Sequence, residues 1–462
     1  MASLEEIRKA RLEKLTTLQK RGLNPYPIST NRDFSLSEVE ADFPNLSKKK
    51  SVTIAGRVMA LRGQGGLVFA DVSDGTGRFQ ILLKKDEMKE EAFPLWSESV
   101  DIGDFIEASG ALFVTKRSEK TLAVASWRML AKSLRPLPEK WHGLTDTEER
   151  FRRRYLDILM NEEVRARFIM RSRIVSALRA ALEAEGFLEV ETSMLQSLAG
   201  GTNAEPFKTH HNALDIDLFL RIAPELDLKK LLIAGYPKVY EIGRSFRNEG
   251  IDVTHNPEFT TAEWYEAYSD AAKQLALVEN IFRGVVKKVS GSTSFIFDGK
   301  EIDCAKPFAV ISYQEALKPF VSGSLSAKEK DSLFKKEVRP RLIQPTFVVE
   351  YPKEMLPLAK GMEGDEKTVD AFQFYVGGLE LVKAFSELND PIEQGRRFMR
   401  EDEHKKAGDK EAQPNDREFV EALEYGCPPA GGVGIGIERL VMLLTNTKNI
   451  REVIFFPTLR PK

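Results

Sequence analysis

The spacing of apolar residues changes along the chain, and each change predicts a different kind of element. Over residues 3–21 apolar side chains recur at helical spacing behind Ser3 and Glu6, a capping-box pair, which predicts one amphipathic helix. From residue 52 to about residue 130, short alternating runs predict β-strands instead, with a helix inserted over residues 85–97. The strand runs are VTIAGRVMAL, GLVFADV, GRFQILL, DFIEASGALFV and TLAVASWRML.

Turns rich in Gly, Asp, Ser and Lys separate these strand runs, so they predict a compact sheet with short connections. Short strands at this density are typical of a small Greek-key barrel of the OB type. Exposed aromatic side chains on such a barrel stack nucleobases. A place in the barrel core is the alternative for Phe69 and Phe79.

After residue 155 helical and strand patterns alternate without the regular strand–helix–strand rhythm of a parallel sheet. We therefore expect an α+β fold, in which the barrel precedes a large domain with a mixed, mainly antiparallel sheet flanked by helices. The expected helices cover residues 162–185 (ended by Gly186), a stretch from Glu225, 270–290 and 391–406, and the expected strands cover 188–192, 218–222, 372–376 and 378–385.

These patterns divide the chain into four segments. Residues 1–50 form a basic N-terminal helix and lead-in, and residues 51–132 form the barrel. Residues 133–155, with two prolines and many charges, form a linker, and residues 156–462 form the large domain.

Composition excludes several classes of protein. The 462 residues are 42% hydrophobic and 30% charged, and no apolar run approaches the ~18 residues of a membrane helix. Residues 1–15 lack the apolar centre of a signal peptide. Cys304 and Cys427 form no metal-binding pattern, so we expect a cytoplasmic protein without disulfides or zinc. At a net charge of −2, nucleic acid would have to bind local basic patches, which solvated helix faces explain equally well.

Two distant segments are suited to binding one polyphosphate. In the segment 246–268, Arg247 and Glu249 are two apart on a predicted strand, which places both on one face, and a turn-rich loop and a second strand follow. In the segment 431–440, four glycines precede a predicted helix that carries Arg439. Two arginines from different elements can hold a polyphosphate from two sides.

The common nucleotide-binding motifs are missing from the sequence. There is no GxxxxGK[ST] loop, and the spacing of Gly432, Gly434 and Gly436 is G-x-G-x-G rather than G-x-G-x-x-G. Glycine spacing alone would indicate only tight packing of a strand against a helix. The arginine hairpin upstream is what favours a nucleotide site.

The sequence contains the motifs FRNEG with THNPEFT, GGVGIGIERL, RYLDILMN, RIAPELDLKKLL and AFSELNDP. Taken together, these motifs resemble the class II aminoacyl-tRNA synthetases, and within them the lysine-specific group. The resemblance extends from Leu4 to Pro461. It implies a homodimeric ligase that joins L-lysine to ATP, releasing pyrophosphate, and then passes lysine to the terminal ribose of tRNA(Lys). A carboxylate is already ionised at pH 7, so this activation needs positioning and charge neutralisation rather than a general base.

The resemblance assigns catalysis to Arg247 at the α-phosphate and Arg439 at the γ-phosphate. It adds Phe259 against the adenine, and its ATP-binding set is Arg247, Glu249, His255, Phe259, Glu380, Glu387, Gly436 and Arg439. For Glu249 an ion pair across the hairpin is the alternative, and for His255 a solvated loop position.

Glu380 and Glu387 are the implied ligands of Mg²⁺, with up to three ions bridging the ATP phosphates. Seven residues separate them, so a regular strand would place the two carboxylates on opposite faces. A bulge or turn is therefore required between them. Lys383 stands between them where the family usually has Asn, and it can weaken metal binding or contact a phosphate.

For lysine, the resemblance implies acidic and polar groups around the two amines and Asn389 with Arg247 at the carboxylate. The amine-binding residues would be Gly201, Glu225, Glu263, Tyr265 and Glu393. Glutamates gathered in one cavity repel each other until a cationic ligand binds. An aspartate-specific relative would need basic residues there, so the glutamates favour lysine.

On the barrel, the resemblance makes Arg62, Phe69 and Gln80 the readers of the anticodon, with Phe69 stacking on the central base. Three alternative functions remain open. They are a synthetase for aspartate or asparagine, a ligase that attaches a lysine-like group to a protein, and a non-catalytic binding module. The last would be expected to lose Arg247, Glu387 or Arg439, and all three are present.

Overall fold

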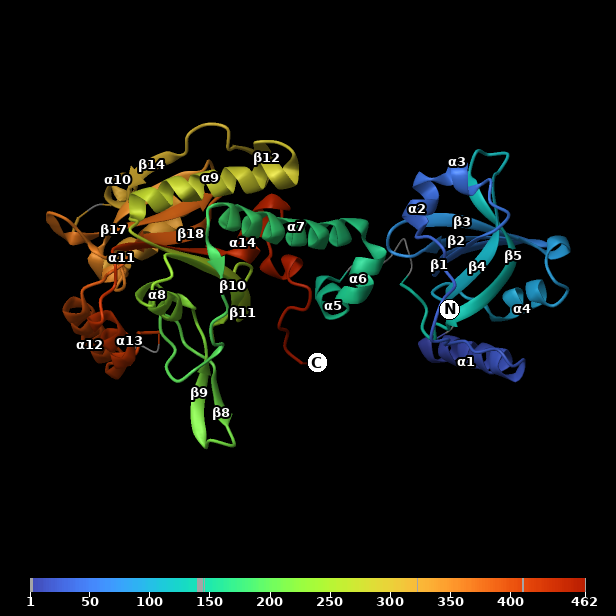
Figure 1. The fold of residues 1–462 in the computed structure, drawn as a ribbon, viewed down its shortest axis with the longest axis horizontal. Helices are drawn as coiled ribbons and strands as arrows, with labels where there is room; N and C mark the ends of the chain where they lie inside the picture. The colour runs from blue at the N-terminus through green and yellow to red at the C-terminus, as the bar shows by residue number, and fades with distance from the viewer. Residues whose placement is uncertain (1–2, 139–143, 145, 322, 409–410, 462) are drawn as a thin grey trace. The chain divides into compact units, whose positions relative to one another are not determined.

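The computed structural model of the chain describes residues 3–138, 144, 146–321, 323–408 and 411–461. It divides into two compact units, residues 1–143 and residues 144–462 (Figure 1). Residues 139–143 and 145 of the predicted linker lie outside the described part. No helix among the residues described is long and apolar enough to cross a membrane.

The first unit contains the predicted barrel. Its strands close in the order β1-β2-β3-β5-β4, and the five predicted strand runs are confirmed. Alternate residues of each strand point inward and form one apolar core, which is why the runs alternate in the sequence. The strands are β1 (Val52–Gln64), β2 (Leu67–Ser73), β3 (Arg78–Lys84), β4 (Phe105–Val114) and β5 (Lys120–Ala131), and a 3₁₀ turn (Lys85–Glu87) and α4 (Ala92–Ser99) form the insert.

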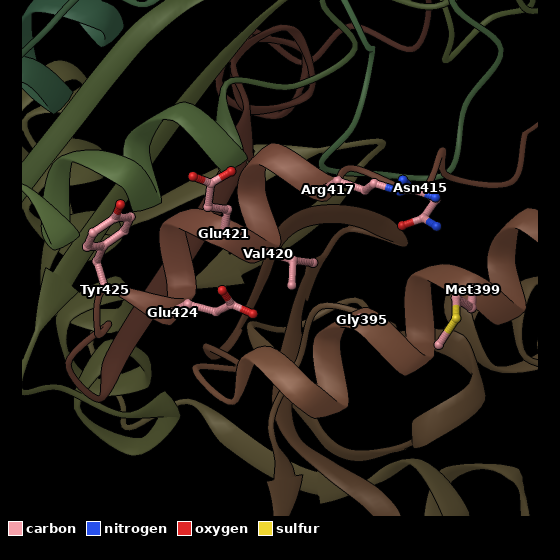
Figure 2. A pocket seen from close by; sticks show the side chains of 8 residues that line it. All are labelled: Gly395, Met399, Asn415, Arg417, Val420, Glu421, Glu424 and Tyr425. Carbon is pink, nitrogen blue, oxygen red and sulfur yellow. The ribbon is translucent and has the colours of Figure 1, made fainter.

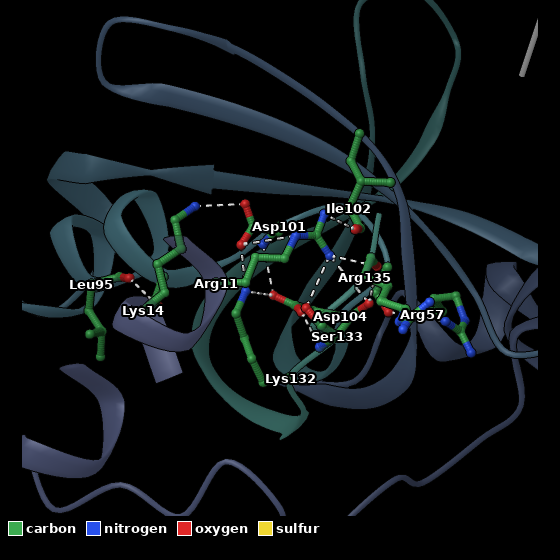
Figure 3. Close-up of polar contacts among 12 residues, drawn as sticks. Arg11, Lys14, Arg57, Leu95, Asp101, Ile102, Asp104, Lys132, Ser133 and Arg135 are labelled. Carbon is green, nitrogen blue, oxygen red and sulfur yellow. Dashed lines mark hydrogen bonds and ion pairs between the residues drawn. The ribbon is translucent and has the colours of Figure 1, made fainter. Parts of the chain in front are cut away.

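The N-terminal helix α1 (Leu4–Lys20) begins at the predicted capping box of Ser3 and Glu6. Its buried Arg11 donates hydrogen bonds to the carbonyl oxygens of Ile102, Ser133 and Arg135 at 3.0 Å each (Figure 3). These contacts satisfy carbonyl groups that β-strand pairing leaves free, and they tie the helix to the barrel. Two short helices, α2 (Leu36–Ala41) and α3 (Phe43–Leu46), complete this unit.

Buried charges reinforce the attachment of α1. Lys132 lies 2.6 Å from Asp101 and 2.7 Å from Asp104, and Lys14 of α1 lies 2.6 Å from Asp101 (Figure 3). Burial raises the pKa of Asp104, whereas at Asp101 the hydrogen bonds from Lys132 and Lys14 outweigh burial and lower the pKa. The two carboxylates therefore share one buried ammonium group.

The second unit is built on a nine-stranded sheet in its described part, with the order β14-β15-β17-β18-β19-β11-β10-β6 and β16 paired to β17. Only the pairs β14–β15 and β10–β6 are parallel, so the expected mixed, mainly antiparallel sheet is confirmed. Its strands are β6 (Leu188–Glu189), β10 (Lys238–Phe246), β11 (Glu258–Ala267), β14 (Ala309–Ser312), β15 (Thr346–Pro352), β16 (Gly361–Met362), β17 (Asp365–Val376), β18 (Leu379–Ser386) and β19 (Ala430–Gly436).

The helices α7 (Glu162–Ala184) and α9 (Ala271–Ser290) lie together on one face of this sheet (Figure 1). Leu178 and Phe282 from these helices pack with Val382 and Ile435 from the sheet in the main apolar core. The α9 helix begins after Asp270, whose side chain accepts from the Lys273 N–H, and ends at Gly291 with φ +72°. The opposite face of the sheet is thereby left for other residues.

Some of the remaining elements also contribute to the main core, through residues such as Phe297, Ile302 and Leu440. Two predicted strands differ in the structure. The strand predicted over residues 188–192 is β6, which has only two residues, and the strand predicted over residues 218–222 is β9, which ends at Leu220. The other elements are α5 (Thr147–Arg152), α6 (Arg154–Met160), β7 (Leu195–Gln196), β8 (Lys208–His211), β9 (Ile216–Leu220), α8 (Glu225–Ile233), β12 (Ser294–Phe297), β13 (Lys300–Asp303), α10 (Tyr313–Leu317), α11 (Ala327–Leu333), a π-helical turn (Phe334–Val338), 3₁₀ turns (Arg339–Arg341, Lys353–Met355 and Ile450–Val453), α12 (Pro391–Lys406), α13 (Arg417–Glu424) and α14 (Ile437–Leu444).

Candidate active site

The sheet face opposite α7 and α9 gathers most of the predicted site residues. Glu263 of β11 and Lys383 of β18 both pair with Gly434 of the strand between them, β19. Their neighbours Ala262, Val382 and Ile435 point into the main core. Because successive side chains alternate between the two faces, Glu263 and Lys383 point away from that core and flank a glycine.

The arginine hairpin differs from its prediction in one respect. Strand β10 ends at Phe246, so Arg247 and Glu249 do not lie on a regular strand as predicted. The Arg247 N–H still donates to the Pro257 carbonyl oxygen at 2.8 Å, but the next N–H, of Asn248, donates to Glu205 at 2.7 Å. The backbone thus leaves the sheet after Arg247, and the two-residue spacing does not fix a shared face.

The Arg247 guanidinium is partly buried and has no ion pair with a carboxylate in the described part of the chain. Its Nε is buried without a hydrogen-bond partner, and its Cζ lies 5.0 Å from the centre of the Phe259 ring. Burial lowers the pKa of Arg247, and the nearby charge of Arg439 lowers it further, while Glu249 and Glu263 act in the opposite direction. A partly buried guanidinium without a carboxylate partner suits the binding of an anion.

Arg439 lies in the first turn of α14, after the glycine segment, and its guanidinium points toward the hairpin loop. It lies 3.1 Å from the Glu380 carbonyl oxygen and 3.2 Å from His255 Nε2. Since a guanidinium only donates, His255 Nε2 must accept, so Nδ1 carries the proton and donates to Asp252 at 2.8 Å. These contacts hold the His255 ring between Asp252 and Arg439.

Two acidic residues fix the surroundings of Arg439. Burial alone would raise the pKa of Asp252, but hydrogen bonds from Thr254 and His255 lower it to about 2. Glu438 contacts Arg171 at 2.8 Å and accepts from the Thr260 N–H at 2.9 Å, so it joins α14 to α7 and β11 and does not contact Arg439. The start of α14 is thus anchored from two sides.

The register of β18 supplies the irregularity that the spacing of Glu380 and Glu387 requires. Phe374 pairs with Val382, but Tyr375 pairs with Glu380, so one residue of β18 is left over between them. The extra residue reverses the alternation of faces, so that Glu380 and Glu387 point to the same face of the sheet despite their spacing of seven. The charge of Glu380 acts on Arg247 and Lys383, which lie on the site face.

Lys229 of α8 was not singled out by the sequence and lies at the centre of the acidic residues. Its Nζ is 2.6 Å from Glu225 and is also ion-paired to Glu387. The rings of Tyr265, Phe385 and Phe419 have their centres 5.5–6.0 Å from this ammonium. Only its i, i+4 spacing to Glu225 was visible in the sequence, and exposed helices show the same pattern.

Glu263 and Tyr265 form a second buried acidic group on β11. The Tyr265 hydroxyl donates to Glu263 at 3.3 Å. Burial, together with the charge of Glu225, raises the pKa of Glu263 to about 8, and burial likewise raises the pKa of Glu387. The expected mutual repulsion of these glutamates is therefore present, and Lys229 relieves it on one side only.

The other predicted lysine-binding residues have mixed surroundings. Gly201, with φ +97°, lies against Glu225, since a Cβ there would be 3.1 Å from the Glu225 Cβ. The Asn389 amide is bonded to Lys360 at 2.9 Å and to the Cys427 carbonyl oxygen at 3.1 Å. Glu393 is ion-paired at 3.0 Å to both Arg397 and Lys353.

On the barrel, Arg62, Phe69 and Gln80 lie on the outer face of three neighbouring strands. Arg62 pairs with Phe69 in the β1–β2 register, and its guanidinium lies 2.8 Å from Asp71 and 3.4 Å from Gln80. Phe69 is partly exposed, whereas Phe79 is buried in the barrel core. Sequence reasoning missed Asp71, which holds Arg62 beside the aromatic ring.

A cavity of about 700 Å³ opens between α12 and α13, and none of the predicted site residues lines it (Figure 2). Gly395, Met399, Asn415, Arg417, Val420, Glu421, Glu424 and Tyr425 form its walls. The predicted chemistry therefore belongs to the sheet face and not to this cavity.

No group of three or more His, Cys, Asp or Glu side chains among the described residues could hold a metal ion alone. Both oxygens of the buried Glu387 nevertheless lack a hydrogen-bond partner of normal geometry. The charge of Glu380 acts on Lys383, which lies on the same face of the sheet. Magnesium commonly takes one or two protein carboxylates and completes its shell with phosphate oxygens and water. The two glutamates fit that mode of binding.

Comparison with known proteins agrees with this geometry. Residues 146–460 match the family "tRNA synthetases class II (D, K and N)", and residues 52–130 match the "OB-fold nucleic acid binding domain". Proteins named lysine–tRNA ligase from Pelotomaculum thermopropionicum and Carboxydothermus hydrogenoformans are 45% and 46% identical, covering 99% of this chain and 96% and 99% of their own. One from Clostridium perfringens is 44% identical over 99% of this chain and 97% of its own. The chain therefore belongs to the class II tRNA synthetases of the D, K and N group.

Proposed function

We propose that the protein is a lysine–tRNA ligase that activates L-lysine with ATP and transfers it to the 3′-terminal ribose of tRNA(Lys). One observation carries the proposal. Two arginines, Arg247 and Arg439, have no carboxylate partner among the described residues, and they lie beside the buried glutamates Glu225 and Glu263. The arginines suit a polyphosphate, and the glutamates suit an amine.

ATP binding rests on the two guanidinium groups. Arg247 would contact the α-phosphate and Arg439 the γ-phosphate, and the Phe259 ring beside Arg247 would stack on the adenine. The Asp252–His255–Arg439 chain of contacts holds the Arg439 side chain in place before ATP arrives. Gly436 leaves open space at the N-terminus of α14, since a Cβ there would meet only the Arg439 side chain at 4.0 Å. Glu249 completes this set as a counter-charge for Arg247.

In the first step a lysine carboxylate oxygen bonds to the α-phosphorus, and the bond from that phosphorus to the pyrophosphate oxygen breaks. The carboxylate is ionised at neutral pH, so the residues position the reactants and neutralise charge without removing a proton. In the second step the ribose 3′-hydroxyl attacks the lysyl carbonyl carbon, and AMP leaves together with the hydroxyl proton. Preorganised arginines of this kind typically contribute 10²–10³-fold each.

Glu380 and Glu387 would hold Mg²⁺ with the help of the ATP phosphates. The ion would supply further neutralisation of the phosphate charge when bound. Because Glu387 is ion-paired to Lys229, the protein already holds this carboxylate in a fixed position. Up to three ions are proposed to bind between these glutamates and the phosphates.

Lysine recognition rests on the glutamates and the groups around them. Glu225, Glu263, Tyr265 and Gly201 would surround an ammonium group, and an ammonium bound there would favour the ionised form of Glu263, whose pKa burial raises to about 8. Arg247 and Asn389 would bind the lysine carboxylate. Glu393 would have to exchange its ion pairs with Arg397 and Lys353 for an ion pair with the substrate.

For tRNA, the outer barrel face with Arg62, Phe69 and Gln80 would read the anticodon. We further propose the domain assignment of residues 1–50 as a lead-in, 51–132 as the anticodon-binding barrel, 133–155 as a linker and 156–462 as the catalytic domain. A homodimer is proposed on the same family basis.

Lysine-dependent exchange of pyrophosphate into ATP tests the proposal, using a panel of all twenty amino acids. We expect exchange with lysine and little with aspartate or asparagine. Glu225 and Glu263 would repel the second carboxylate of aspartate, and the neutral amide of asparagine offers no cation to pair with them. Arg247→Met should lower the exchange rate by about 10²-fold or more, as loss of one preorganised donor does. Arg244→Met is the matched control, because Arg244 lies three residues earlier, within β10, and is partly exposed. Exchange with aspartate alone, or full activity of the Arg247 variant, would overturn the proposal.

A further inference from the structure

Lys383 places a third cation on the site face of the sheet. It lies in β18 between Gln373 of β17 and Gly434 of β19. Glycine contributes no side chain, and a Cβ at Gly434 would only make ordinary van der Waals contacts, the nearest at 3.6 Å from the Glu263 side chain. Lys383 and Glu263 therefore flank this glycine on the face of the sheet that points away from the main core.

In the part of the chain that the structure describes, the Lys383 ammonium makes no hydrogen bond or ion pair. Glu380 and Glu225 favour its charge from a distance, whereas Arg247 and Lys335 oppose it. Burial lowers its pKa, as expected for an ammonium whose water has been replaced by protein without a close carboxylate. By contrast, the neighbouring buried lysine, Lys229, has a carboxylate at 2.6 Å.

A lysine that served only the fold would be expected to resemble Lys229. Retaining a partly buried cation beside another cation costs stability unless an anion binds there. Lys383 also stands between Glu380 and Glu387, the two carboxylates that fit a divalent ion. The phosphates of a bound nucleotide would need positive charge in this region. Either a metal ion or the Lys383 ammonium can supply that charge.

We propose that the Lys383 ammonium is a fixed ligand of the phosphate oxygens of the bound nucleotide, and that it takes the place of one divalent cation. The inference rests on the proposed function, since it assumes that ATP binds this face. A tethered ammonium neutralises phosphate charge without having to be captured from solution. ATP binding should accordingly depend less on free Mg²⁺ than it would with a neutral side chain at this position.

Calorimetric titration of ATP into the full-length protein tests this, once with saturating Mg²⁺ and once with excess EDTA. We expect the wild type to bind in EDTA, and Lys383→Met to bind about tenfold or more weakly there, as loss of one charge-assisted hydrogen bond predicts. With Mg²⁺ the two proteins should differ by much less. Lys383→Arg should retain most of the binding in EDTA, because it keeps the charge.

Lys335→Met is the matched control, because Lys335 is a nearby lysine that is exposed and already paired to Asp331 at 2.7 Å. Equal loss of affinity in both lysine variants would indicate a general effect of net charge and would overturn the inference. The same holds if Lys383→Met binds ATP in EDTA as the wild type does. Lys383→Asn serves if the Met variant does not fold.

The titration separates this inference from the proposed function. If the wild type binds ATP but gives no lysine-dependent pyrophosphate exchange, the proposed function fails while the role of Lys383 can still be measured. If exchange occurs and the Lys383 variants bind ATP normally without Mg²⁺, only the inference fails.

Discussion

Glu263 is a residue whose ionisation should leave a mark on stability. Its pKa is about 8 in the folded protein because of burial and the Glu225 charge, against 4.5 as its usual value. Between those pH values the folded state keeps a proton that the unfolded state has lost, so the free energy of unfolding falls as the pH rises. Glu263→Gln should therefore gain stability relative to the wild type between pH 5 and pH 8, by a few kcal/mol. Urea unfolding at both pH values measures this.

Glu258→Gln removes a carboxylate from the exposed beginning of the same strand and is the control for Glu263. A constant difference between the Glu263 variant and the wild type at both pH values would contradict the raised pKa. The comparison needs no substrate and therefore tests the electrostatics of the empty site.

Lys229 should be among the most sensitive single positions in the second unit. Lys229→Met leaves Glu225 and Glu387 buried without their shared cation, and breaking such a buried pair costs about 3–5 kcal/mol. Lys230→Met, one residue along α8, removes a contact to the exposed Glu418 and should cost about 1 kcal/mol or less. Chemical denaturation of both variants gives the comparison. Equal losses would mean that the Lys229 cluster contributes no more than a surface contact.

The motifs of the sequence identified the arginines and glutamates as candidate site residues. They did not predict which side chains these residues would contact. Arg439 of α14 contacts the Glu380 carbonyl oxygen of β18, and Glu263 lies on β11 of the same sheet. The contacts of Lys229 with Glu387 and of Asn389 with Lys360 join segments far apart in the sequence, and no local spacing encodes them. Such pairings follow from the sheet order, which the sequence did not reveal.

At the scale of elements, strand β19 shows that its glycines have different roles. A Cβ at Gly432 would lie 2.0 Å from the Glu387 carboxylate and 2.4 Å from the Tyr265 ring, whereas at Gly434 the nearest atom would be 3.6 Å away. Gly432→Ala should therefore displace both side chains and lower stability and lysine binding together, while Gly434→Ala should leave stability within about 1 kcal/mol. Thermal unfolding and lysine titration test the pair. Similar behaviour of the two variants would refute the distinction.

Elements in which apolar residues recur at a regular spacing were predictable from the sequence, whereas short or irregular elements were not. The spacing of apolar residues predicted α7 and α9 to within a residue or two because both bury a continuous apolar stripe in the main core. Strand β6 keeps only two residues because it pairs with β10 over Val239 and Tyr240 alone. The bulge in β18 depends on its pairing with β17, so its necessity could be inferred from the sequence but its position could not.

The whole molecule contains two units with separate apolar cores. The barrel core draws only on residues from Leu18 to Met129, and the main core of the second unit only on residues from Ile174 onward. A unit of about 140 residues with its own core is expected to fold alone. We therefore predict that a fragment of residues 1–143 unfolds cooperatively on heating and binds an anticodon stem-loop, with binding weakened by Arg62→Ala.

The complementary fragment, residues 144–462, should retain lysine-dependent pyrophosphate exchange, because every residue assigned to ATP and lysine lies in it. It should fail to charge tRNA(Lys) efficiently, since the proposed anticodon contacts belong to the other fragment. Thermal unfolding and exchange assays on each fragment, with the intact chain as the reference, separate the alternatives. If the second fragment folds but loses exchange, activation needs a group from the barrel unit. In that case the division of labour argued from the two cores would be wrong, although the fold of each unit would stand.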